Sequence, residues 1–235
     1  MNNIIYKTND YSMFNLLKGN RIIKPSNLRK LDKSIEKKYL ISPIMVNENY
    51  EIIDGQHRFY IAREKKLPLY YFIVDGYGRN ECEILNTVGT SWGSMDYLKS
   101  FVELEYPNYI LLNDFMERNN EKLEISRIFF TFTRGTDNTA KFKSGDFEIK
   151  DIEKTEIFYR WYLDFKDTEP FGKILFAHSI VLMFNHPEYN HERMMQKMKY
   201  QGYKMQTRSY MIEYQQLFSD IYNYKARKGD EVYFR

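Results

Sequence analysis

Cysteine is almost absent from this sequence of 235 residues, in which Cys82 is the only one. A single thiol excludes an intramolecular disulfide, and it also excludes a zinc site built from several cysteines. A chain that does without disulfides suits a reducing compartment, so we expect a cytoplasmic protein.

Long apolar runs are missing as well. The best candidate, residues 174–184, is shorter than the roughly 20 residues that a membrane span needs, and it contains His178. The first residues lack the apolar core of a secretory signal. We therefore expect no membrane segment.

Neither sign of charge is in large excess. The 35 Lys and Arg residues nearly balance the 32 Asp and Glu residues, and the net charge is +3. That value is too small for electrostatics alone to indicate a nucleic-acid-binding protein. The last stretch is more basic, and we interpret its excess as a solvated helical face. The residues concerned are Arg193, Lys197, Lys199, Lys204, Arg208, Lys225, Arg227, Lys228 and Arg235.

Aromatic residues, by contrast, are abundant, with 21 Tyr and 17 Phe. Exposed aromatic rings can stack on nucleic-acid bases. An AT-rich genome would also enrich Tyr, Phe, Asn, Lys and Ile, and we favour that explanation because composition alone does not place a residue at a site.

Apolar periodicity predicts an α+β protein with two parts. Residues 1–90 alternate helices and short strands, which indicates a small α/β domain, whereas residues 91–235 have the spacing of successive helices. Within these parts we expect a short helix at 13–17, and we expect 134–146 to be the most exposed connection, because it is polar and without periodicity.

The most informative stretch is 51–62. Ile52 and Ile53 end a predicted strand, Asp54 and Gly55 make a tight turn, and a predicted helix begins near Gln56. The first amides of a helix have no partners within it, and the helix dipole favours an anion there. A strand, a glycine turn and a helix start that bears His and Arg therefore predict a phosphate site.

These motifs resemble the ParB/sulfiredoxin superfamily over residues 19–100. Residues 30–35, 41–46 and 52–58 follow its order of helix, strand, hairpin and turn. The chain matches the ParB branch at Gly55, Arg58 and Ala62. Where that branch has a Glu followed by an Arg, this chain has Gln56 and His57. The chain matches the sulfiredoxin branch at Gly55, His57 and Arg58. Where that branch has its catalytic Cys, this chain has Gln56. The Asp-Gly-Gln-His-Arg turn resembles that of phage-type members.

The resemblance implies a nucleotide bound by its phosphates. The phosphates would be held by the turn residues Gly55, Gln56, His57 and Arg58. Two further residues of this chain, Arg21 and Asn86, would complete the nucleotide site. The implied ligand is a nucleoside triphosphate, CTP or ATP, with Mg²⁺, and DNA is the implied partner. Without a thiolate at position 56 there is no nucleophile for sulfinic-acid repair, and Gln in place of Glu weakens the case for hydrolysis.

Each polar side chain of the turn also has a structural interpretation. Arg58 can bind phosphate with its forked donors or pair with Asp54. His57 can donate to phosphate, act as a base or hydrogen-bond a carbonyl. Asp54 can bind Mg²⁺ or a ribose, or it can be an ordinary turn residue. The remaining histidines are too irregularly spaced to predict a metal site.

Three functions follow from these observations. The first is a ParB-like protein that binds a nucleotide at the turn from Asp54 to Arg58 and associates with DNA through its helical part. The second is a phosphoryl-transfer or phosphodiester enzyme, such as an NTPase, kinase or nuclease, with His57 and Asp54 as catalytic residues. The third is a protein-interaction module or inhibitor from a mobile element, with a vestigial pocket.

Overall fold

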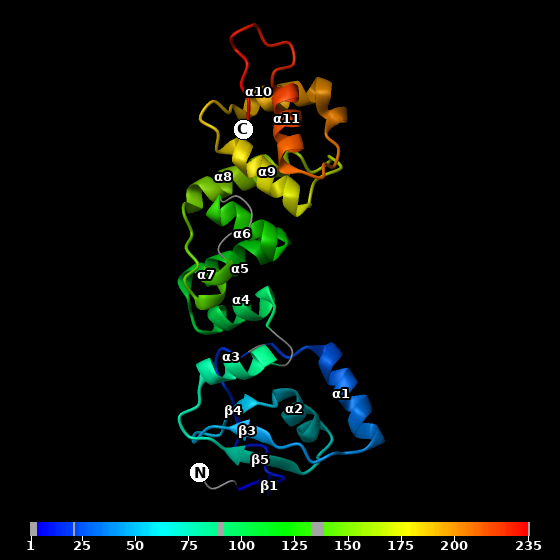
Figure 1. The fold of residues 1–235 in the computed structure, drawn as a ribbon, viewed down its shortest axis with the longest axis vertical. Helices are drawn as coiled ribbons and strands as arrows, with labels where there is room; N and C mark the ends of the chain where they lie inside the picture. The colour runs from blue at the N-terminus through cyan, green and yellow to red at the C-terminus, as the bar shows by residue number, and fades with distance from the viewer. Residues whose placement is uncertain (1–3, 21, 89–91, 133–138, 235) are drawn as a thin grey trace. The chain divides into compact units, whose positions relative to one another are not determined.

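The computed structural model describes residues 4–20, 22–88, 92–132 and 139–234, with side chains omitted at 86–88 (Figure 1). The chain has a small five-stranded sheet and many helices, so the predicted α+β class is confirmed. It divides into two compact units, Met1–Pro107 and Asn108–Arg235. None of the described helices is long and apolar enough to cross a membrane.

The first unit extends beyond residue 90 because a further helix, α4 (Ser94–Glu103), is bonded to it. The Glu103 carboxylate accepts a hydrogen bond from the Gly19 amide at 2.9 Å, and the Ser100 hydroxyl donates to the Gly19 carbonyl at 2.5 Å. These contacts place α4 with the sheet rather than with the helices that follow.

The sheet of the first unit has the strand order β1-β5-β3-β4-β2. Its strands are β1 (Tyr6–Thr8), β2 (Asn15–Leu16), β3 (Ile44–Val46), β4 (Glu51–Asp54) and β5 (Leu69–Ile73). β3 and β4 form an antiparallel hairpin, whereas β3 and β5 are parallel neighbours. The helix α2 (Gln56–Glu64) connects β4 to β5 on the other side of β3, so the hairpin and this helical connection meet at the turn after β4.

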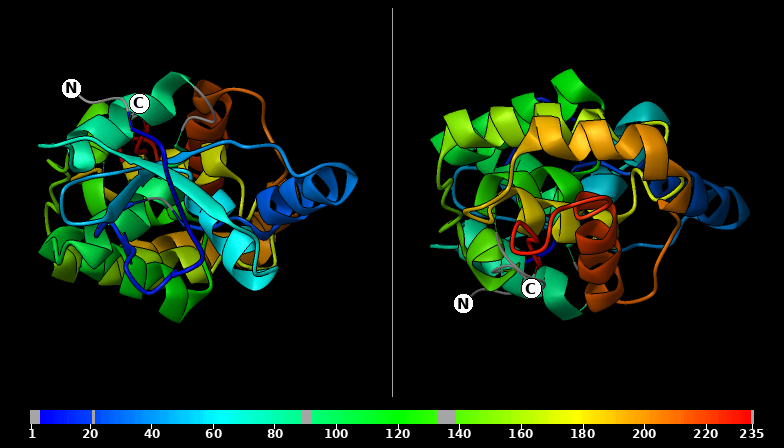
Figure 2. Two further views of the ribbon diagram at one scale, coloured as in Figure 1. Left: turned by 90° about the horizontal axis from the view of Figure 1, so that it is seen from below. Right: turned by 90° about the horizontal axis from the view of Figure 1, so that it is seen from above.

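Two further helices complete this unit, α1 (Pro25–Lys37) and α3 (Arg79–Val88). α1 begins with Pro25, whose fixed torsion suits the first helical position. It packs on α2 and extends past the edge of the sheet, and none of its residues is buried (Figures 1 and 2). One side of α1 therefore remains open beside the turn.

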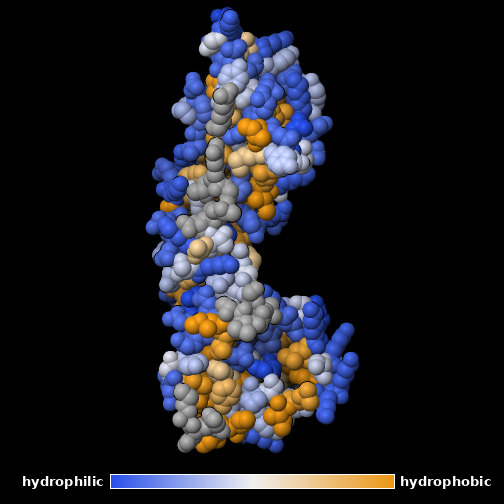
Figure 3. Space-filling view, in the orientation of Figure 1, coloured by the Kyte–Doolittle hydropathy of each residue, from blue (hydrophilic) through white to orange (hydrophobic). Residues whose placement is uncertain are grey.

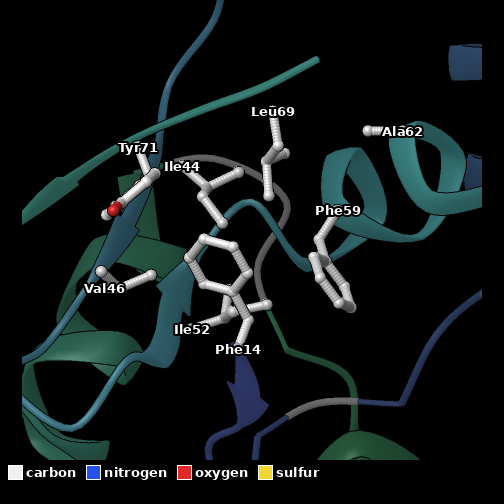
Figure 4. Close-up of a cluster of buried hydrophobic side chains, with 8 residues drawn as sticks. All are labelled: Phe14, Ile44, Val46, Ile52, Phe59, Ala62, Leu69 and Tyr71. Carbon is white, nitrogen blue, oxygen red and sulfur yellow. The ribbon is translucent and has the colours of Figure 1, made fainter. Parts of the chain in front are cut away.

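The core beneath the turn is apolar and closely packed (Figure 4). β3, β4 and β5 contribute Ile44, Val46, Ile52, Leu69 and Tyr71, α2 contributes Phe59 and Ala62, and Phe14 comes from the segment before β2. The Phe14 ring lies edge-on to Phe59 at 5.9 Å and to Tyr71 at 5.0 Å. This core holds the start of α2 against the end of β4.

The second unit consists of helices in its described part. They are α5 (Pro107–Asn119), α6 (Leu123–Thr131), α7 (Thr139–Ser144), α8 (Ile152–Leu163), α9 (Ile174–Phe184), α10 (His191–Gln201), the short 3-10 helix η1 (Gly202–Lys204) and α11 (Met211–Tyr222). Aromatic rings fill their core: Tyr162, Phe165, Phe176, Tyr214 and Phe218 are all fully buried. On the face drawn in Figure 3, apolar side chains reach the surface of this unit only in small patches.

Two local predictions are wrong. Residues 13–17 form no helix; Asn15 and Leu16 form β2, which pairs in parallel with β4 while Phe14 enters the core. The stretch 134–146 is not simply an exposed connection, because α7 begins within it at Thr139 and Phe142 is fully buried. Residues 133–138 lie outside the described part.

Candidate functional site

The turn after β4 has the geometry predicted from the sequence. β4 ends at Asp54, Gly55 adopts a left-handed backbone with φ of 97°, and α2 begins at Gln56. A Cβ on Gly55 would stand 2.6 Å from Cγ2 of Ile44 and 2.9 Å from Nη2 of Arg58. Only glycine fits here, for the backbone torsion and for the space alike.

A pocket of about 300 Å³ opens at this turn. The five residues Asp54, Gly55, Gln56, His57 and Arg58 all line it, and Asn20, Leu31 and Ile53 complete the lining. Leu31 comes from α1, so the pocket has an apolar wall opposite the polar turn. Nothing in the local sequence around Leu31 indicated this position, which depends on how α1 packs on α2.

Arg58 makes the ion pair that the structural interpretation predicted. Its Nη2 donates to the Asp54 carboxylate at 2.7 Å, and its Nη1 donates to the Ser42 hydroxyl at 2.6 Å. About one third of the Arg58 side chain and half of the Asp54 side chain are exposed, so the pair borders solvent. The Nε of Arg58, however, is buried and has no hydrogen-bond partner among the described residues.

His57 is held from the start of α1. Its Nε2 accepts a hydrogen bond from the Lys24 amide at 3.3 Å. An acceptor nitrogen carries no proton, so a neutral ring bears its hydrogen on Nδ1. The Lys24 amide thus orients the imidazole beside the pocket that it lines.

Lys24 links the pocket wall to α4. Its ammonium group donates to the Asp96 carboxylate at 2.7 Å, and Asp96 is almost completely buried. The same Asp96 oxygen accepts the Gly93 amide at 2.9 Å at the start of α4. The position of His57 thus depends on a partly buried ion pair that also fixes the start of α4.

The remaining predicted residues differ in what the structure shows of them. Gln56 is buried, and its side-chain amide has hydrogen-bonding capacity but no acid–base function. Arg21 lies outside the described residues. Asn86 falls within α3, and its side chain is not described.

A metal ion would have few protein ligands at this site. The described residues include no group of three or more His, Cys, Asp and Glu side chains that could hold a metal. Magnesium is often bound by one or two carboxylates together with the phosphates of its nucleotide. Asp54, half exposed at the pocket rim, is the carboxylate that fits this mode.

Comparison with known proteins gives a coarse structural likeness. No sequence profile of a known family matches the chain, and no curated protein matches it. Among solved structures it is similar to the C2221 form of a Pnob8-like ParB-N domain, with 15% sequence identity and a TM-score of 0.34 over 93% of this chain and 97% of that one. At that TM-score the likeness is coarse, and it assigns no role to individual residues.

Proposed function

We propose that the first unit binds a nucleotide, with a phosphate group at the start of α2. The observation that carries this proposal is the arrangement around Gly55: a glycine that no other residue can replace, beside an arginine whose buried Nε has no described partner. A buried donor without a partner costs about 1–3 kcal/mol, and a phosphate oxygen would remove that cost.

The donors at this turn suit a phosphate. Arg58 has five N–H groups, and Ser42 and Asp54 engage one each. The first amides of α2 point out of the helix at its positive end, where the helix dipole favours an anion. The ion pair with Asp54 holds the guanidinium in place while leaving donors for the ligand.

The apolar wall suits the rest of a nucleotide. Pockets for small ligands usually enclose about 300–1,000 Å³ and combine apolar walls with a few polar groups. The present pocket lies at the small end of that range, and α1 contributes Leu31 to its lining. A base or ribose would pack against Leu31, with Asn20 as a hydrogen-bonding partner.

The ligand class that we propose is a nucleoside triphosphate, CTP or ATP. Mg²⁺ would bind Asp54 together with the phosphates and would neutralise charge beside Arg58. The helical unit would provide the contact with DNA. The catalytic roles of His57 and Asp54, and the vestigial pocket of an interaction module, stay predictions.

Calorimetric titration with CTP and with ATP, each with and without Mg²⁺, tests nucleotide binding. Arg58→Ala removes charge-assisted hydrogen bonds worth about 1.5–3 kcal/mol, so the dissociation constant should rise about 10- to 100-fold. Arg58→Lys keeps the positive charge but loses the forked donors of the guanidinium. Its dissociation constant should lie between those of the wild type and Arg58→Ala.

Arg63→Ala is the matched control. Arg63 lies on the same helix, but its guanidinium stacks over the Phe59 and Tyr60 rings and does not line the pocket. This variant should bind like the wild-type protein. Undiminished binding by Arg58→Ala, or no binding of either nucleotide by the wild type, would overturn the proposal.

A further inference from the structure

A second feature of the molecule lies far from this pocket in the sequence. Residues 193–212 contain five basic residues and no Asp or Glu, although the whole chain is nearly balanced in charge. We call these residues the basic tyrosine stretch; they run from α10 through η1 to the start of α11. Its basic members are Arg193, Lys197, Lys199, Lys204 and Arg208.

The same stretch carries the most exposed large apolar side chains of the described chain. Tyr203 is 73% exposed, Tyr200 and Tyr210 are 68% exposed, and Ile212 is 65% exposed. A scatter of single exposed tyrosines needs no explanation in so tyrosine-rich a protein. Their concentration within thirteen consecutive positions does, because it is not what composition alone produces.

The basic side chains of this stretch form no ion pairs within the described part of the chain. Lys197 donates to the Tyr224 carbonyl at 2.6 Å, and Arg193 donates to the Asp230 carbonyl at 3.0 Å. The Lys204 ammonium lies 6.0 Å from the centre of the Tyr203 ring. Arg193, Lys197 and Lys204 thus contact neutral oxygens and an aromatic ring, whereas the charge of Arg208 acts on Glu169.

Two carboxylates beside the stretch accept hydrogen bonds from its own residues. Glu213 accepts the amides of Ser209 and Tyr210 at the start of α11. Glu169 accepts the hydroxyl of Thr207 at 2.7 Å, and the hydrogen bonds from Thr207 lower its pKa. Both acids support the backbone of the stretch, which leaves its surface basic.

The exposed rings follow a path along α11. Tyr200 contacts Tyr224, just beyond the C-terminal end of α11, with ring centres 6.4 Å apart. Tyr210 immediately precedes the N-terminal end of the same helix. The two rings therefore lie near opposite ends of a helix of 12 residues, about 18 Å long at 1.5 Å per residue.

We propose that the basic tyrosine stretch binds single-stranded nucleic acid. Bases would stack on Tyr200, Tyr203 and Tyr210, and the phosphates would lie near Lys199, Lys204 and Arg208. Proteins that hold single strands combine a basic track with successive aromatic platforms, because every base has a face on which to stack. The inference rests on the nucleic-acid association proposed above, and it specifies the surface and the kind of strand.

Two alternatives fit the surface less well. A duplex keeps its base faces stacked internally, so it would use the cations but not the rings. A protein partner would use the tyrosines, but a stretch with five cations and no acid would require an unusually acidic partner. The pocket of about 600 Å³ at the start of the stretch is a less basic surface, because Glu188, Asp230 and Glu231 line it together with four cations, Arg193, Lys197, Lys225 and Arg227.

Fluorescence anisotropy with a labelled oligothymidylate of about 16 nucleotides tests the proposal, since that is the upper end of known site sizes. Stacking contributes about 1–3 kcal/mol per base, so each Tyr→Ala change at 200, 203 or 210 should weaken binding roughly 5- to 100-fold. The Tyr→Phe variants should retain binding. Raising salt from about 50 to about 200 mM should weaken binding of the wild type.

Tyr233→Ala is the control for loss of an exposed tyrosine, because Tyr233 is 53% exposed in the same unit and outside the stretch. It should bind like the wild type. Circular dichroism melts of all variants should coincide, since the replaced rings are largely exposed.

Three outcomes would overturn the inference. One is equal affinity for duplex and single strand, the second is binding unaffected by the Tyr→Ala changes, and the third is self-association in light scattering that those changes abolish. Nucleotide titrations on the same variants separate this inference from the proposed pocket. The Tyr→Ala proteins should bind nucleotide normally, and Arg58→Ala should bind the oligonucleotide normally.

Discussion

The role of Gly55 can be tested by adding a single methyl group, Gly55→Ala. The left-handed torsion costs a residue with a Cβ about 1–2 kcal/mol. The new methyl would also stand 2.6 Å from Cγ2 of Ile44, which is fully buried and cannot move aside. Forcing a methyl group into a packed site costs about 1–3 kcal/mol more. We therefore expect the free energy of unfolding to fall by about 2–5 kcal/mol.

Gly76→Ala separates these two contributions. Gly76 has φ of 75°, but no atom lies within 4 Å of the place its Cβ would take. It should therefore show only the torsional cost, about 1–2 kcal/mol. At a denaturant slope of about 2 kcal/mol per M, the urea midpoint of the first unit should fall roughly 1–2.5 M for Gly55→Ala and roughly 0.5–1 M for Gly76→Ala.

Urea unfolding followed by circular dichroism gives the midpoints, and hydrogen exchange of α2 and β5 shows that the first unit is the one affected. Equal midpoints for the two variants would refute the crowding at Gly55. Nucleotide titration of folded Gly55→Ala adds a second readout, since the methyl would also displace Arg58 from its position.

Two further predictions concern the stability of each unit. Lys24→Met leaves the buried Asp96 carboxylate without its cation and should lower the free energy of unfolding in urea by about 1–3 kcal/mol. Lys18→Met breaks an exposed ion pair and should lower it by less than about 1 kcal/mol. Equal losses for the two variants would show that the Lys24 ion pair does not support the pocket. In the second unit, burial raises the pKa of three tyrosines most strongly, so these residues release protons near pH 10 in the unfolded chain but retain them in the folded unit. The contribution of these tyrosines to the free energy of unfolding should be fully present below about pH 10 and should be lost as the pH rises above it. Urea unfolding between about pH 8 and about pH 11 measures this loss, and an unchanged midpoint would contradict it. The residues are Tyr159, Tyr162 and Tyr189.

Local sequence patterns were sufficient to predict the pocket's polar side. A strand, Asp-Gly and a helix start are contiguous, so their geometry follows from torsions and hydrogen bonding within a few residues. All five residues of the turn line the pocket for that reason. Leu31 could not be found in this way, because its position depends on the packing of α1 against α2, which no local pattern records.

Where the sequence prediction failed, tertiary contacts outweighed local preference. Residues 13–17 have helical spacing, but β4 has a free edge at which Asn15 and Leu16 can pair, and Phe14 can fill the core. Phe142 lies in a polar stretch that shows no periodicity, yet the Tyr109 ring stacks near it and the Tyr109 hydroxyl donates to its carbonyl. A single buried ring can order a segment whose pattern is otherwise polar.

The two interpretations of Arg58 that the sequence left open turn out to be compatible. The pair with Asp54 satisfies the structural interpretation, but it uses one Nη and leaves Nε buried without a described partner. If Arg58 served only to stabilise the turn, the fold would be more stable with its Nε–H hydrogen-bonded to the protein or exposed to water. If the turn binds the proposed nucleotide, an arginine already fixed by Asp54 and Ser42 would lose little conformational freedom on binding, so the ion pair would prepare the site rather than compete with it.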